Sequence, residues 1–228
     1  MNSKTTISTG TDSLSTLVPA PPAETTRPGP SAPLRLHTGF AHPGTATYQI
    51  CVDRVKRKYL DHYGAVVDPR PDLFVIVWDG GGPSPTSDGT LGVAGLTSAA
   101  GRRLLSENYL DVPVEHACTG LAPGTPVQRG AIAEMGPLAS FYPGAGMVLL
   151  RGLPRIARHL GYEFLLSTLT QKLHALARAA GWDFHTLTNA RRADLAATHS
   201  ADWGTYYSTK PRTGILHCEQ TIALQATG

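Results

Sequence analysis

The sequence has little charge, few cysteines and no long apolar run. Only 16% of the 228 residues are charged, and the formal net charge of +3 is too small to favour nucleic-acid binding by electrostatics alone. Three widely spaced cysteines give no disulfide framework and favour a reducing compartment, so we expect a cytoplasmic protein. No apolar run approaches the roughly 20 residues that span a bilayer, and the N-terminal region lacks the apolar segment of a secretory signal. We therefore predict no stable membrane insertion.

Glycine and proline are abundant, with 24 and 18 residues, which argues against a simple helical bundle. Residues 1–33 consist mostly of Ser, Thr, Pro and Gly and contain no aromatic residue. Such a segment buries too little apolar surface to offset the conformational entropy lost on folding. We therefore predict a disordered tail over 1–33 and one folded domain over 34–228.

Apolar periodicity predicts an α+β domain in which strands alternate with helices. The strand, helix and strand over 130–168 predict a parallel pair with a right-handed crossover, within a mixed, twisted sheet flanked by helices. Pro154 should kink the middle helix or divide it into two pieces. We expect strands near 34–40, 72–78, 91–97, 130–140, 163–168, 182–188 and 213–224, helices near 46–63, 147–160 and 171–180, and a short helix or turn at 102–110.

The most informative stretch is 129–160, where an apolar strand carries one carboxylate, Glu134. Gly136-Pro137 interrupts that strand two residues later, so we expect it to bulge and splay, which frees backbone groups for an extended ligand. Gly144-x-Gly146 then opens a helix, and glycines there let backbone N–H groups approach a phosphate. The segment expected to hold a phosphate is Gly144, Ala145, Gly146 and Met147.

Three blocks of the sequence resemble the thermostable hemolysin family. The first runs from Ser106 to Glu115, the second from Arg129 to Ala139, and the third is Trp203-Gly204-Thr205-Tyr206-Tyr207 followed by Pro211. They occur in order, with spacing similar to that of the family, over about residues 38–218. The strand, loop and helix of 129–160 also resemble the GNAT superfamily, and the arrangement of the family is similar to that of acyl-homoserine lactone synthases.

This resemblance implies a GNAT-like α+β acyltransferase.

 It implies transfer of an acyl group from a phosphopantetheine thioester to an amine or alcohol acceptor, in specialised metabolism. The thioester would be acyl-CoA or an acyl or peptidyl carrier protein, used as a co-substrate, so no tightly bound cofactor is expected. The N–H groups of Leu138 and Ala139 are expected to polarise the thioester carbonyl.

Two carboxylates are candidates for catalysis. Glu134 is expected to act as general base on the acceptor, because burial in a cleft raises the pKa of a carboxyl group towards neutrality. Its alternative role is a structural ion pair with an arginine such as Arg129. Glu107 is expected either to bind a substrate amine or to hold its block against the strand, and its alternative is a capping or salt-bridging role.

Aromatic and basic side chains complete the predicted site. Tyr206, or its neighbour Tyr207, is expected to protonate the leaving thiolate, and the alternative is an aromatic lid that includes Trp203. Arg151 recurs with two further arginines at helical spacing beside the phosphate segment. This stripe would steer an acidic carrier protein towards the site, or it is an ordinary solvated face. The other two arginines are Arg155 and Arg158.

The remaining patterns favour no other chemistry. The nine histidines show no metal-binding spacing, so we predict no metal site. His116 and Cys118 make a Cys/His nucleophile conceivable, but a chance neighbourhood is favoured. Two functions of other classes stay open: a membrane-active, hemolysin-like protein, as the family name suggests, and a non-catalytic module that binds a carrier protein.

Overall fold

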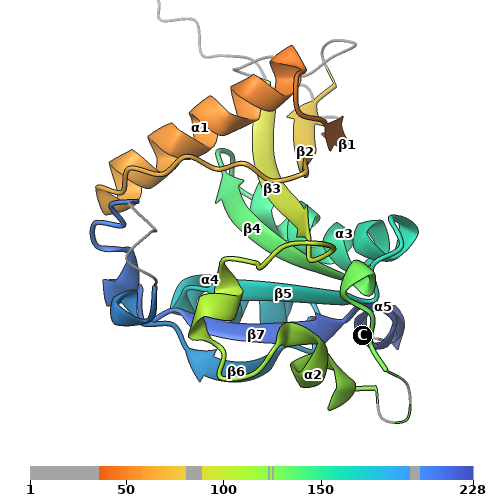
Figure 1. The fold of residues 1–228 in the computed structure, drawn as a ribbon. Helices are drawn as coiled ribbons and strands as arrows, with labels where there is room; N and C mark the ends of the chain where they lie inside the picture. Colours follow the sequence, from red (N-terminus) through yellow and green to blue (C-terminus); the bar gives the residue numbers. More distant parts are fainter. Residues whose placement is uncertain (1–35, 81–88, 123, 125, 196–200, 228) are drawn as a thin grey trace, which may run out of the picture. The chain divides into compact units, whose positions relative to one another are not determined.

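The computed structural model of the protein describes residues 36–80, 89–122, 124, 126–195 and 201–227 (Figure 1). The tail expected over 1–33 lies outside these residues. Seven strands form one sheet in the order β1-β2-β3-β4-β5-β7-β6. The strands are β1 Leu36–Ala41, β2 Leu73–Asp79, β3 Thr90–Ser98, β4 Ile132–Ser140, β5 Phe164–Leu169, β6 His185–Asn189 and β7 Arg212–His217. The α-helices are α1 Ala46–Tyr63, α2 Val114–Thr119, α3 Ala145–His159, α4 Gln171–Ala179 and α5 Cys218–Thr227.

The sheet is mixed, as predicted. All neighbouring strands are antiparallel except β4 and β5, which are parallel and are connected through α3. These two strands pair only over Ile132–Glu134 and Phe164–Leu166, although β4 continues to Ser140. Beyond that point they diverge, as Figure 1 shows. The predicted splay of the strand that carries Glu134 is therefore observed.

Helix α1 occupies the predicted range and is capped at both ends. Thr45 accepts a hydrogen bond from the Tyr48 N–H at 3.2 Å, which satisfies one free amide of the first turn. Gly64 ends the helix with a φ of 66°, a left-handed conformation that glycine adopts without steric cost. The apolar face of α1 packs against Phe74 and Ile76 of β2.

Helix α3 packs against the opposite face of the sheet and contains Pro154. Two outcomes were predicted at this proline, a kink or a division. The division is wrong, because the helix runs unbroken from Ala145 to His159. Proline supplies no N–H to the carbonyl four residues earlier, that of Leu150. The Trp182 indole N–H donates to this carbonyl at 2.6 Å and replaces the missing backbone hydrogen bond.

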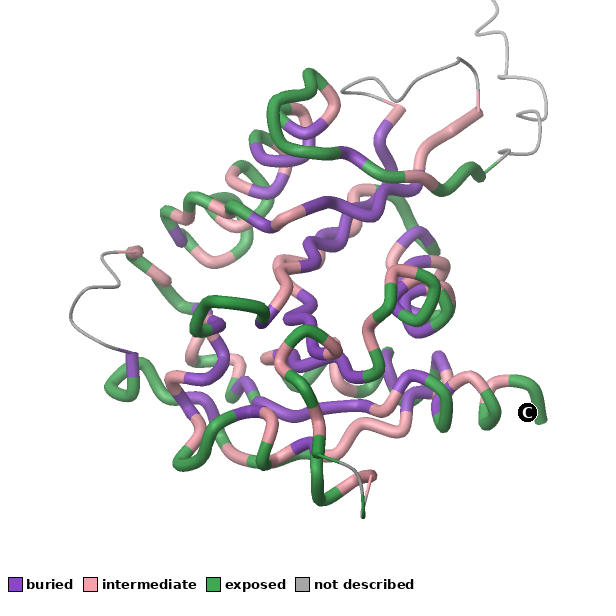
Figure 2. Tube along the Cα trace, turned by 45° about the vertical axis from the view of Figure 1, so that its right-hand side comes forward, coloured by how far each residue is buried: buried purple, intermediate pink, exposed green. Residues whose placement is uncertain are grey.

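Helices cover both faces of the sheet. Alternate residues of each central strand face α3 on one side, for example Val75 and Leu165, and α1 or α2 on the other, for example Ile76 and Leu166. The central strands are accordingly almost continuously buried, as Figure 2 shows. Within the part of the chain that the structure describes, no helix combines the length and apolar character that crossing a bilayer would need.

Two element predictions need correction near the C-terminus and in the first family block. The strand expected over 213–224 ends at His217, and Cys218 begins helix α5. The buried side of this segment packs on α3 as a helix. Helix α2, which follows the short helix or turn predicted at 102–110, is not among the predicted elements.

Candidate functional site

A cavity of about 330 Å³ opens where β4 and β5 diverge. Its walls come from the C-terminal half of α1, the 67–71 loop, the segment 103–109, strand β4 and the segment 201–206. Glu134 and Tyr206 both line this cavity, which we call the Glu134 cavity. Because the strands separate here, the sheet provides a recess that ordinary β-pairing would close.

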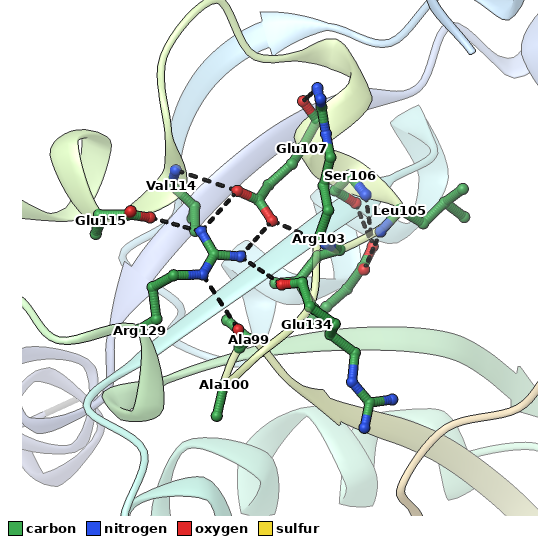
Figure 3. A network of polar contacts seen from close by, with 12 residues as sticks. Ala99, Ala100, Arg103, Leu105, Ser106, Glu107, Val114, Glu115, Arg129 and Glu134 are labelled. Carbon is green, nitrogen blue, oxygen red and sulfur yellow. Dashed lines mark hydrogen bonds and ion pairs between the residues drawn. The ribbon is translucent and has the colours of Figure 1, made fainter. Parts of the chain in front are cut away.

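The Glu134 carboxylate is buried and held by the segment that precedes η1 (Ser106–Tyr109) (Figure 3). The Leu105 N–H donates to Oε2 at 2.8 Å, and the Ser106 N–H donates to Oε1 at 3.0 Å. The Ser106 hydroxyl group also donates to Oε1, at 2.5 Å. Three donors thus orient one carboxylate at the cavity wall.

Burial decides the protonation behaviour of Glu134. Desolvation raises the pKa of its carboxyl group, and the hydrogen bonds from Ser106 and Leu105 offset only part of this increase. The ion pair with Arg129 that we considered does not form: the guanidinium contacts Glu107 and Glu115 instead. Glu134 is therefore a carboxylate without a cationic side chain bonded to it among the described residues.

Glu107 lies in a different environment, in the network that Figure 3 draws. Arg129 donates to both of its carboxylate oxygens, at 3.0 and 2.8 Å. The Leu104 N–H adds a hydrogen bond at 2.7 Å. Burial by itself raises the pKa of the Glu107 carboxyl group, but the bonds from Arg129 and Leu104 together hold it below its ordinary value. Glu107 is an ionised, paired carboxylate that lies outside the Glu134 cavity.

A cluster of aromatic side chains lines another part of the Glu134 cavity. The buried Tyr206 ring lies 5.2 Å from Trp203 and 6.4 Å from Tyr59, measured between centroids. Its hydroxyl group donates to the Thr168 carbonyl oxygen at 3.2 Å. Burial raises the pKa of Tyr206 well above its ordinary value, so its hydroxyl group keeps its proton at neutral pH.

A second, smaller cavity of about 160 Å³ lies beyond the same wall. It is lined by Leu138 of β4, Lys172 of α4 and residues 167–170 of β5 and its C-terminal end, and we call it the Lys172 cavity. The two cavities share lining residues: Tyr59, Met135, Gly136, Pro137, Thr168 and Tyr206. The two cavities therefore adjoin along these residues.

The predicted phosphate segment begins helix α3 as expected. Gly144 precedes the helix with a φ of 88°. The amides that follow have partners within the chain: Ala145 N–H donates to the Tyr142 carbonyl at 3.2 Å, and Gly146 N–H to Ser140 Oγ at 3.1 Å. Met147 N–H donates to the Gly144 carbonyl at 3.0 Å. A phosphate bound here would have to compete with these acceptors.

The predicted arginine stripe is exposed along α3. Two of its members interact with α5: Arg158 pairs with Glu219 at 3.1 Å, and Arg155 bonds Gln225 at 3.3 Å. Arg151 is the exposed member nearest the start of the helix. The two arginines in the C-terminal half of the stripe thus already have partners on α5.

The cysteines and histidines form no second site among the described residues. All three cysteines are free and buried, and burial raises the pKa of the Cys118 thiol to about 12. A thiol with such a pKa carries almost no thiolate at neutral pH, which disfavours the Cys/His nucleophile. Over the described ranges, no group of His, Cys, Asp and Glu side chains is arranged to hold a metal ion.

The comparison with protein families identifies the chain. The family model described as thermostable hemolysin matches residues 41–222. The chain belongs to the thermostable hemolysin family. A search of curated protein sequences finds no match.

Solved structures share the fold of this chain. TofI in its apo form is 14% identical with a TM-score of 0.52, over 83% of this chain and 96% of TofI. FeeM, an N-acyl amino acid synthase from uncultured soil microbes, is 11% identical with a TM-score of 0.55, over 85% and 97%. BjaI, a CoA-dependent acyl-homoserine lactone synthase with SAM and isopentyl-CoA, is 12% identical with a TM-score of 0.51, over 85% and 88%. With the diverging parallel pair β4–β5, these likenesses confirm the predicted GNAT-like α+β fold.

The three sequence blocks of the thermostable hemolysin family meet at the Glu134 cavity. The first block contributes Ser106 and Tyr109, the second Glu134, and the third Trp203 and Tyr206. Of the residues predicted to hold the donor, Leu138 lines the Lys172 cavity, whereas the Ala139 side chain packs beneath α1.

Sequence reasoning missed two residues at the wall between the cavities. Tyr59 lies within the helix predicted near 46–63 and Thr168 ends the strand predicted near 163–168, but neither is predicted as a site residue. Thr168 lies 62 residues from Ser106, its hydrogen-bond partner, so no local spacing signals the contact. Ser106 itself stands in the first family block, which was the available signal.

Proposed function

We propose that this member of the thermostable hemolysin family transfers an acyl group from a phosphopantetheine thioester to an amine or alcohol acceptor. The observation that carries the proposal is the pair of cavities that meet at one wall, with a buried carboxylate in the larger one. A thioester and an acceptor approaching from opposite sides would meet beside Glu134. The known chemistry of two similar folds supports this reading, since FeeM is an N-acyl amino acid synthase and BjaI is a CoA-dependent acyl-homoserine lactone synthase.

In this proposal the acceptor occupies the Glu134 cavity and loses its proton to Glu134, directly or through one water molecule. The raised pKa of the carboxyl group makes it a stronger base than an exposed glutamate. Tyr206, which keeps its proton, donates a hydrogen bond to the sulfur as it leaves. Glu107 acts as a positioning residue, because its pairing with Arg129 fixes the segment whose amides hold Glu134.

The donor is proposed to extend from the Lys172 cavity towards the start of α3. Backbone N–H groups of Leu138 and Ala139 would polarise the thioester carbonyl. The Gly144, Ala145, Gly146 and Met147 segment would meet the phosphate groups, with Arg151 beyond it as a cation for coenzyme A or for a carrier protein. The thioester is consumed as a co-substrate, and its carrier is either coenzyme A or an acyl or peptidyl carrier protein.

The test is a thiol-release assay with octanoyl-CoA and with octanoyl-loaded acyl carrier protein. Each donor is offered L-phenylalanine, phenethylamine, L-serine and ethanolamine, and products are identified by mass spectrometry. We expect acceptor-dependent thiol release by the wild type and a loss of roughly 100-fold in Glu134→Gln, in line with removal of a general base. The acid limb of the kcat/KM profile should lie above the ordinary pKa range of glutamate.

Glu219→Gln is the matched control, because Glu219 is an exposed glutamate on α5, outside both cavities. It should retain the wild-type rate. Full activity of Glu134→Gln would refute the assignment of the base. Absence of bound thioester in native mass spectrometry, together with no acyl transfer from either donor, would refute the acyltransferase.

A further inference from the structure

A chain of three hydroxyl groups leads from the Glu134 carboxylate across the sheet. Ser106 Oγ lies 2.5 Å from Glu134 Oε1 and 2.8 Å from Thr168 Oγ1. Thr168 Oγ1 in turn lies 2.7 Å from Thr213 Oγ1. Ser106 and Thr213 are buried, whereas Thr168 is half-buried and lines both the Glu134 cavity and the Lys172 cavity.

The charge of Glu134 sets the direction of these hydrogen bonds. An ionised carboxylate only accepts, so Ser106 must use its single hydroxyl proton towards Glu134. Ser106 then accepts from Thr168, and Thr168 accepts from Thr213. If Glu134 gains a proton it becomes a donor, and the bonds from Glu134 through Ser106 to Thr168 can reverse. This row of hydroxyl groups therefore has two states, which differ in the direction of the hydrogen bonds along it.

We propose that Ser106 and Thr168 relay the proton that Glu134 takes from the acceptor to the thiolate that leaves the donor. This inference rests on the proposed acyl transfer. The relay also returns Glu134 to its ionised form. Because Glu134 is only 8% exposed, bulk water has little access to remove its proton. Thr168 is the member of the chain that reaches the donor side of the wall.

The relay balances the reaction without an external acid. The acceptor nitrogen forms a bond to the thioester carbon, and the bond from this carbon to sulfur breaks. Glu134 takes one proton from nitrogen and passes one to Ser106, which passes its own to Thr168. Thr168 passes its hydroxyl proton to sulfur, which leaves as a thiol. Glu134 ends as a carboxylate, and each hydroxyl group regains one proton.

The decisive experiment compares two donors with one acceptor from the panel above, phenethylamine. Octanoyl-CoA releases an alkyl thiolate that needs a proton, whereas S-octanoyl thiophenol releases a stable aryl thiolate. In Thr168→Val we expect the single-turnover rate with octanoyl-CoA to fall about 100-fold, the usual order for a lost proton-transfer group. The single-turnover rate with the aryl thioester, which needs no proton at sulfur, should stay within about threefold of wild type. Taking the ratio of the two rates on one preparation removes any effect of partial unfolding.

Two control variants separate the relay from packing. Thr168→Ser keeps the hydroxyl group and should keep the wild-type ratio. Thr221→Val makes the same substitution at a buried threonine of α5 that lines neither cavity, and it should also keep this ratio. Tyr206→Phe removes a hydrogen bond to the leaving sulfur but leaves the Thr168 hydroxyl group in place, so it should lower the ratio less than Thr168→Val does.

The solvent isotope effect gives a second measurement. A relay that moves several protons predicts a curved dependence of the octanoyl-CoA rate on the deuterium fraction in the wild type and a linear one in Thr168→Val. An unchanged ratio of donor rates in Thr168→Val would overturn the relay and leave the acyltransferase standing. If the wild type transfers no acyl group from either donor to any amine, the proposed function itself fails, which is a different result.

Discussion

Two glutamates held by one short segment behave in opposite ways. Residues 104–106 supply an amide to Glu107 and two amides to Glu134, so the same turn fixes both carboxylates. Their other neighbours differ. The Arg129 guanidinium pairs with Glu107, whereas Glu134 faces a cavity. The pKa of Glu107 is therefore lowered and that of Glu134 raised. The presence of a glutamate in a sequence block therefore does not show which of these two environments its side chain will have.

Removing the cation from this pair should destabilise the protein. In Arg129→Met we expect the free energy of unfolding at neutral pH to fall by about 3 kcal/mol, because the buried Glu107 carboxylate loses its charged partner. A depressed pKa in the folded state stabilises it above the unfolded pKa, and this contribution disappears as pH falls through the folded pKa. The difference between variant and wild type should thus shrink below the ordinary pKa of glutamate, as urea unfolding at several pH values will measure.

Arg158→Met is the control for that measurement. It removes an ion pair with Glu219 in which both side chains are largely exposed, and such pairs contribute about 0–1 kcal/mol. Equal losses in the two variants would contradict the structural importance assigned to the pairing of Glu107.

At the scale of elements, the interior proline of α3 shows how a helix tolerates a residue that should break it. The carbonyl left without a partner by Pro154, that of Leu150, is buried but bonded to Trp182, which follows α4. This side chain and the proline are thus parts of one arrangement, although 28 positions of sequence separate them. The contact ties the interior of α3 to the segment between α4 and β6.

A double-mutant cycle tests this arrangement. Trp182→Phe should lower the free energy of unfolding by about 1–3 kcal/mol through the unsatisfied Leu150 carbonyl, beyond the loss of packing. In the Pro154→Ala background the restored backbone N–H can bond this carbonyl, so the same substitution should cost about 1 kcal/mol less. Denaturant unfolding of the four proteins gives the coupling energy. Strict additivity would contradict the compensation.

Most elements could be predicted because their signals are local. The range of α1 follows from its apolar face, its Thr45 cap and Gly64, and the parallel pair β4–β5 follows from the chain order. Pro154 and α5 could not be predicted, because each depends on a partner distant in sequence: Trp182 for the proline and α3 for α5. The same reason separates Glu134, found through its strand, from Thr168, which only the folded sheet brings near Ser106.

At the scale of the whole domain, the aromatic wall depends on a contact between segments that are 140 residues apart. The Thr205 N–H donates to the Tyr63 carbonyl at the end of α1, at 2.8 Å, and Val66 pairs with Asp202. Gly204 makes this approach possible, because a Cβ atom there would lie 2.1 Å from the Tyr63 carbonyl oxygen. The third family block, which carries Tyr206, is thereby fixed beside the end of α1.

Gly204→Ala should separate the 201–206 segment from α1. The clash falls on backbone atoms, which cannot rotate away, so we expect a loss of more than about 1 kcal/mol in stability and faster hydrogen exchange at the Thr205 amide. Gly101→Ala is the matched control: its φ of 70° is also positive, but a Cβ atom there meets nothing within 4 Å. Equal effects of the two substitutions would show that backbone conformation alone, and not the close contact, is responsible.

The wall that the two cavities share has a consequence for affinity. Tyr59, Thr168 and Tyr206 touch both spaces, so a molecule that orders these side chains from one side changes the surface offered on the other. Thermodynamic linkage then requires the effect to be reciprocal: whatever factor one occupant applies to the dissociation constant of the other, it experiences in return. Substitutions at this wall will therefore alter cooperativity between two ligands even where they leave each ligand's own affinity almost unchanged.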